Sequence, residues 1–220
     1  MIKKLLMPHK YDKKIRIGPN RDGGYVLAGD LINCERLLSI GCKNETGFEE
    51  EFLRHNQNPN IKCQIYDVEG ACDLASRDER VLFSLKKIEN IEHVVENSLS
   101  TIIQMDIEGG EFECLSSHSG NFQNVWQMII EFHFYDSIIK NYNLTDIFAK
   151  LNSSFYLIHM HGNNHRGYIH SGIPQVLECT YVNKGLFKTI PEKETSAFPI
   201  KGLDFPNSIS KKGMLLDWWI

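Results

Sequence analysis

Short apolar runs alternate with segments of helical periodicity from residue 37 onward, and this alternation constrains the fold more than any other feature of the chain. Each run has the length of a buried strand. Strands that alternate with helices are joined most economically by right-handed crossovers. The sequence therefore predicts an α/β fold, with a Rossmann-like, doubly wound and mostly parallel sheet covered by helices on both faces. The seven predicted strands span residues 37–40, 61–68, 81–88, 101–107, 125–134, 155–161 and 175–182.

Helical patterns fill most of the links between these strands. Phe48, Phe52 and Leu53 form one apolar stripe on the first predicted helix. The link between the second and third strands is predicted to be a short helix or irregular. The predicted helices span 47–53, 91–99, 110–118 and 144–151, the last one capped by Asn143 or Thr145.

The two ends of the chain do not follow the alternation. With 220 residues, we expect one domain, with an N-terminal extension over 1–36, a core over 37–184 and a C-terminal loop and tail over 185–220. Residues 17–27 (IGPNRDGGYVL) predict a tight turn that leads into a short strand. The apolar tail 215–220 (LLDWWI) is expected to pack onto the body or onto a partner subunit, which would make a homo-oligomer.

Composition narrows the function classes. No apolar stretch approaches the ~20 residues that cross a bilayer, and the N-terminus lacks the apolar run of a signal peptide, so we expect a soluble, cytoplasmic protein. A formal net charge of −4, with no run of more than two basic residues, makes nucleic acid an unfavourable partner. The six cysteines form no C-x-x-C pair and are expected to be buried or partly buried thiols rather than zinc ligands or disulfides.

Polar residues gather where the first two predicted strands end, and in an open parallel sheet ligands bind beyond those ends. The first strand is followed by Gly41 and, six residues later, by Gly47, a spacing that is not the G-x-G-x-x-G of dinucleotide sites. Gly41 would allow close approach of a ligand, and Gly47 would start a helix. The second strand ends at Asp67, our first candidate for binding ribose hydroxyls, with Glu69 as the second.

Three later strands carry polar residues two positions apart, which therefore point the same way. The pairs are Asp106 with Glu108, Glu131 with His133, and His159 with His161. Carboxylates in such apolar runs are costly unless they face a polar crevice. The recurrence predicts one shared site, whereas Glu111 is expected to serve the start of the next helix.

At this point the residues resemble a known family, the FkbM-like branch of class I S-adenosylmethionine-dependent methyltransferases. The resemblance rests on MDIEGGE (105–111), on MIIEFH (128–133) and on segments in matching order that begin at residues 17, 37, 159 and 203. It implies a seven-stranded sheet whose last strand is antiparallel, with the cofactor across the ends of strands 1, 2 and 4. The loop after strand 1 departs from the G-x-G-x-G that is commoner in the class. By position, the resemblance assigns cofactor binding to Gly41, Cys42, Lys43, Asn44, Thr46, Gly47, Asp67, Val68, Asp106, Ile107 and Glu108.

The chemistry that the resemblance implies is methyl transfer, most simply to an oxygen of a sugar, a glycan or another small hydroxylated metabolite. An acceptor hydroxyl must lose a proton, and His133 is the first candidate base, with His161 or Glu131 as substitutes. Asp106, Glu131, His133 and His161 are also ligands that a divalent cation would accept. Two other interpretations stay open: a non-catalytic nucleoside-binding or assembly module, and an NAD-dependent oxidoreductase that lacks the usual glycine fingerprint.

Overall fold

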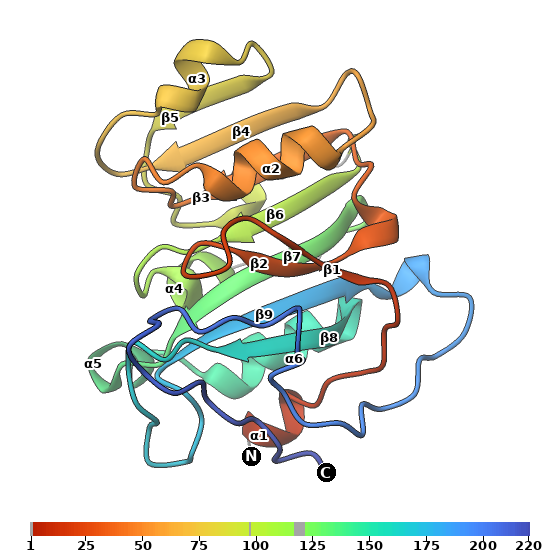
Figure 1. The fold of residues 1–220 in the computed structure, drawn as a ribbon, viewed down its shortest axis with the longest axis vertical. Coiled ribbons are helices and arrows are strands. Elements are labelled where there is room, and N and C mark those ends of the chain that lie inside the picture. The colour runs from red at the N-terminus through yellow and green to blue at the C-terminus, as the bar shows by residue number, and fades with distance from the viewer. Residues whose placement is uncertain (1, 97, 117–121) are drawn as a thin grey trace.

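A computed structural model describes residues 2–96, 98–116 and 122–220. Its centre is a seven-stranded sheet in the order β5-β4-β3-β6-β7-β9-β8 (Figure 1). Pairs from β5 to β7 are parallel, and β9 runs antiparallel to both β7 and β8. The predicted α/β sheet with its last strand antiparallel is therefore confirmed. The strands are β3 (Arg36–Ile40), β4 (Lys62–Asp67), β5 (Val81–Leu85), β6 (Thr101–Met105), β7 (Val125–His133), β8 (Phe155–Gly162) and β9 (Val176–Asn183).

The central strands are apolar along their whole length because both faces of the sheet are covered. All five residues of β3 are buried, and Leu37 and Leu38 belong to different core clusters on opposite faces. One face carries α2 (Gly47–His55) together with a hairpin of β1 (Lys14–Ile17) and β2 (Tyr25–Ala28) (Figure 1). The other face packs against α4 (Glu111–Ser116) and α6 (Leu144–Ser154). The buried side chains of α6 are Leu144, Ile147, Phe148 and Leu151.

Shorter elements complete the chain. Asn143 caps α6, as predicted, by accepting a hydrogen bond from the Asp146 N–H. The α-helices are α1 (Ile2–Leu5), α3 (Asp73–Arg77) and α5 (Asp136–Ile139), and the 3₁₀ turns are η1 (Gly29–Leu31), η2 (Ile91–His93) and η3 (Lys184–Leu186).

The helix predicted over 91–99 is wrong. Only η2 forms there, and the described residues after it are in turns or irregular, while residue 97 lies outside the described part. Ile91 and Val94 are buried, and one 3₁₀ turn aligns two positions three residues apart, so no longer helix is needed to bury them. The helix predicted over 110–118 corresponds to α4, but its last two positions fall in 117–121, outside the described residues.

The N-terminal hairpin is held against the sheet by buried side chains. The predicted turn is present, and its partner strand β1 was not predicted. Gln127 of β7 accepts a hydrogen bond from the Ala28 N–H (2.8 Å) and donates one to its carbonyl (3.0 Å). The Thr180 hydroxyl donates to the Val26 carbonyl at 2.5 Å. The hairpin is thereby joined to β7 and β9.

The C-terminal tail packs on the body of its own chain. Phe198 pairs with Leu216, the Trp218 indole donates to the Leu6 carbonyl (3.3 Å), and both chain ends lie together in Figure 1. The six cysteines are unpaired and buried, as predicted. No helix in the described part of the chain is long and apolar enough to span a membrane.

Candidate functional site

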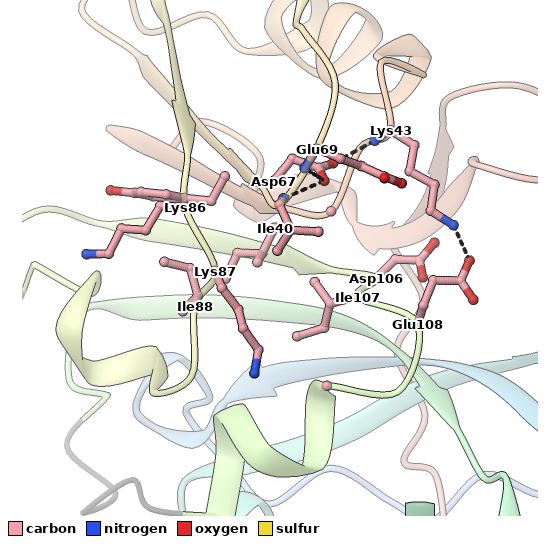
Figure 2. Close-up of a pocket in the computed structure, with 14 residues that line it drawn as sticks. Ile40, Lys43, Asp67, Glu69, Lys86, Lys87, Ile88, Asp106, Ile107 and Glu108 are labelled. Atoms are coloured by element: carbon pink, nitrogen blue, oxygen red, sulfur yellow. Dashed lines mark hydrogen bonds and ion pairs between the residues drawn. The ribbon is translucent and has the colours of Figure 1, made fainter.

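A cavity of about 500 Å³ opens where β3, β4 and β6 end (Figure 2). Seven of the predicted cofactor residues line it: Gly41, Lys43, Asp67, Val68, Asp106, Ile107 and Glu108. The prediction missed six further lining residues: Ile40, Tyr66, Lys86, Lys87, Ile88 and Gly110. The third strand was predicted to run to residue 88 but ends at Leu85, so residues 86–88 lie beyond a strand end, where such linings are expected.

Gly41 brings the ends of β3 and β6 together. Its φ is +85°, and a Cβ added there would lie 1.8 Å from the Asp106 carbonyl oxygen. A side chain is therefore excluded by the chain's own backbone. Lys43 and Asn44 follow with positive φ values of 45° and 62°, an uncommon conformation for such residues. The loop after β3 is thus a tight, specified turn.

The Asp67 carboxylate fixes this loop. One of its oxygens accepts hydrogen bonds from the Cys42 N–H (2.9 Å) and the Lys43 N–H (2.8 Å). The other accepts from the Val68 and Glu69 N–H groups at 2.7 and 3.3 Å. Burial opposes the charged form, but these four bonds outweigh it, so the pKa of Asp67 is lowered. A carboxylate has about four acceptor sites, and Asp67 accepts four hydrogen bonds from backbone N–H groups. Glu69, in contrast, is exposed and lines the cavity.

A second cavity of about 270 Å³ adjoins the first on the face covered by the hairpin. Gly41, Lys43, Asp106 and Glu108 line both cavities. Of these four residues, Lys43 and Glu108 form an ion pair, with the ammonium 2.5 Å from the carboxylate (Figure 2). The second cavity is acidic, since its lining includes one lysine against the carboxylates of Asp22, Glu45, Glu49, Asp106 and Glu108.

His133 is buried next to the shared residues, oriented by Glu111. The Glu111 carboxylate, fully buried at the start of α4, lies 3.0 Å from His133 Nδ1 and accepts hydrogen bonds from the Ile107 and Gly109 N–H groups. His133 Nε2 then faces Asp106 at 3.9 Å and Glu108 at 3.6 Å. Burial lowers the pKa of His133, but the Glu111 hydrogen bond and the surrounding carboxylates outweigh it and raise the pKa.

Asp106 lies at the junction of the two cavities. Burial raises its pKa to about 7, against the opposing charge of His133. The Tyr25 hydroxyl donates to one carboxylate oxygen at 3.4 Å, and the other oxygen is buried with no hydrogen-bond partner. Glu131 is buried behind it, 3.9 Å from His133 Nε2, and its pKa is raised well above the usual value by burial and by Asp106. Neither Glu131 nor His133 is among the residues that line the two cavities.

The third predicted polar pair contacts the C-terminal loop and lines neither cavity. His159 and His161 both contact the Asp204 carboxylate, at 2.8 and 3.2 Å, and His161 Nε2 lies 3.0 Å from the Asn207 side chain. Asp204 and Asn207 belong to the C-terminal loop. The pair therefore holds that loop against β8, a contact that strand periodicity could not reveal because the partners are more than 40 residues away.

Three residues could hold a metal ion in the described part of the chain: Asp106, Glu108 and His133 bring one ligand atom each to within 4.8 Å of one another. Two of the four predicted ligands, Asp106 and His133, are in this group; Glu131 and His161 are not. Among the other predicted cofactor residues, Cys42 lines the second cavity, Thr46 bonds to Glu50, Asn44 accepts from the Asp73 N–H, and Gly47 begins α2.

Comparison with known proteins finds similarity to solved structures, at the level of the fold. No protein-family model and no curated protein matches the chain. A Clostridium thermocellum structure assigned as an rRNA methylase has a TM-score of 0.45 at 10% identity, covering 68% of this chain and 88% of that chain. A Klebsiella pneumoniae structure assigned as an O-methyltransferase has a TM-score of 0.42 at 12% identity, covering 70% and 76%. TM-scores below 0.5 assign no activity to this chain.

Proposed function

We propose that the chain is an S-adenosylmethionine-dependent methyltransferase. The observation that carries the proposal is the cavity at the ends of β3, β4 and β6, because the resemblance of MDIEGGE (105–111) to the FkbM-like family puts the cofactor across these three strand ends. A cavity of about 500 Å³ lies within the usual range for small-molecule sites. The loop fixed by Asp67 would receive the methionine part, and Glu69 would bind the ribose hydroxyls.

The second cavity is the proposed acceptor site, since it meets the first at Asp106. Its acidic lining repels phosphates and favours a neutral polyhydroxylated acceptor or a cationic one. This supports a sugar, a glycan or a small hydroxylated metabolite, and O-methylation as the reaction. S-adenosylmethionine supplies an activated methyl group, so correct positioning provides much of the acceleration.

We assign proton removal to Asp106. It lines the acceptor cavity, whereas the candidate base His133 is buried behind it with Nδ1 held by Glu111. Bound S-adenosylmethionine would supply the methyl group, and the Asp106 carboxylate would take the proton that the acceptor hydroxyl loses as its oxygen is methylated. His133 and Glu131 would set the charge of Asp106, and His161 would hold the C-terminal loop.

Transfer of labelled methyl groups to an acceptor panel tests this function. Neutral sugars and other hydroxylated compounds should be methylated, whereas their phosphorylated counterparts should not. Asp106→Asn should keep cofactor affinity within about twofold and slow transfer at least about 100-fold. Binding of NAD instead of S-adenosylmethionine, or turnover by Asp106→Asn at the wild-type rate, would refute the assignment.

The sequence also predicts a divalent cation, and part of the geometry suits one. Asp106, Glu108 and His133 would hold it, and the buried Asp106 oxygen without a partner is a vacant acceptor. Such an ion would acidify an acceptor hydroxyl. Metal analysis and turnover in the presence of a chelator decide the point: loss of turnover that is restored by Mg²⁺ supports the ion, and unchanged turnover removes it.

A further inference from the structure

A basic cavity lies at the opposite edge of the sheet from the site described above. It has a volume of about 200 Å³ and adjoins the first residues of β8 and the residue that follows β9. Because β9 is antiparallel, these two points share the edge away from the ends of β3, β4 and β6. Lys4, His9, Lys184 and Lys193 line the cavity, and no described residue in its lining is acidic.

Basic side chains are held close together there. Lys193 Nζ lies 2.8 Å from His9 Nε2, and the Lys184 ammonium lies 4.9 Å from the centroid of the Tyr156 ring. Burial, and next the charge of Lys193, lower the pKa of His9 to about 4. His9 is therefore neutral near pH 7 and accepts a hydrogen bond from the Lys193 ammonium.

The carboxylates on either side of Lys193 pair with other lysines. Glu192 pairs with Lys10 at 2.9 Å, and Glu194 pairs with Lys14 at 3.8 Å. Among the described residues, the ammonium groups around the cavity thus have no carboxylate as an ion-pair partner. An arrangement of this kind is unfavourable by itself and becomes favourable when an anion enters.

We propose that this cavity binds the phosphate group of a phosphorylated ligand, with the Lys184 and Lys193 ammonium groups as its main donors. Lysine binds phosphate as a compact point charge with several donors, and the small volume suits one such group rather than a whole nucleotide. The site is separate from the proposed methyl-transfer site, so it would hold the ligand away from the chemistry.

Titration of the full chain with inorganic phosphate, followed by NMR of the histidine rings, tests the proposal. The Lys184→Ala/Lys193→Ala double variant should bind phosphate at least about tenfold more weakly, whereas Lys188→Ala, an exposed neighbour outside the lining, should stay within about twofold. Saturation with sulfate, which does not titrate near neutral pH, should raise the pKa of His9, because a nearby anion favours the charged ring. The His9 measurement uses the wild-type protein and so stands even if the double variant fails to fold.

Vesicle sedimentation distinguishes the two sources of the phosphate group, a lipid headgroup and a soluble ligand. Sedimentation with phosphatidic acid vesicles but not with phosphatidylcholine vesicles, lost in the double variant, supports the site with a lipid headgroup as its ligand. Binding of inorganic phosphate without vesicle binding supports it with a soluble ligand. Equal phosphate affinity in the wild type and the double variant, or no phosphate or vesicle binding by the wild type, would overturn the proposal.

Discussion

Asp67 and Glu69 are two residues apart, yet we assign them different roles: Asp67 fixes the loop after β3, and Glu69 binds the ribose hydroxyls. Asp67→Asn replaces one acceptor oxygen with a donor that faces backbone N–H groups, so the free energy of unfolding should fall by roughly 2 kcal/mol and cofactor affinity should fall with it. Glu69→Gln should weaken cofactor binding with unchanged stability. Chemical denaturation and calorimetry measure the two effects. A stable Asp67→Asn variant with normal affinity would show that the loop does not depend on this carboxylate.

Glu111 acts on the site through His133. Glu111→Gln keeps an oxygen for the two backbone N–H groups but removes the charge, so the pKa of His133 should fall, and transfer should slow about tenfold with little change in cofactor affinity. The matched control is Glu113→Gln, a carboxylate on the same helix that pairs with Lys87 at the surface. NMR titration of His133 gives the pKa. If both variants leave it unchanged, Glu111 only caps the loop and the helix.

At the residue scale, the sequence predicted the carboxylates better than the histidines. Asp67, Asp106 and Glu108 line the cavity because strand ends place them there, and strand ends can be read from the sequence. The environment of His161 depends on Asp204, which comes from the C-terminal loop, and no periodicity links the two. The prediction for Gly41 was also incomplete. It gave close approach of a ligand as the reason for the glycine, whereas the group that a Cβ would meet is the Asp106 carbonyl, which follows another strand.

The element that completes the acceptor cavity is the β1–β2 hairpin, and Gln127 fastens it. Gln127→Ala leaves the buried N–H and carbonyl of Ala28 without partners, so the free energy of unfolding should fall by roughly 2–4 kcal/mol. Gln57→Ala, at an exposed position after α2, is the control and should change it by less than about 0.5 kcal/mol. Urea denaturation measures both. Equal stabilities would mean that the hairpin is held by its apolar side chains alone.

Among the elements, the seven strands were predictable because apolar runs of strand length are conspicuous. The link between β5 and β6 was not, because a pattern of buried residues three apart fits both a 3₁₀ turn and an α-helix. Strand β1 was missed for a related reason: its alternating basic residues and isoleucines cover four residues, too few for a period to stand out.

The whole molecule carries buried charge near the C-terminal loop, which makes its stability depend on pH. Burial opposes the charge of His161, but Glu178 and Asp204 outweigh it and raise its pKa from 6.5 to about 9. A raised folded-state pKa gives stability that is complete below pH 6.5 and is lost as the pH rises through 9, at most about 3 kcal/mol. Denaturation at several pH values should show this fall, and His161→Asn should flatten it. The exposed His165→Asn should not; an equal slope in all three proteins would contradict the assignment.

The central claim is that the cavity beyond β3, β4 and β6 binds S-adenosylmethionine, and calorimetric titration of the wild type and two tryptophan variants tests it most directly. Val68 lines the cavity and is 64% exposed, so Val68→Trp should fill the cavity without unfolding the chain; Leu82, 57% exposed on β5, does not line it. We expect one cofactor per wild-type chain, normal affinity in Leu82→Trp and a loss of at least about 100-fold in Val68→Trp. No binding by the wild type, or equal binding by all three proteins, would contradict the claim.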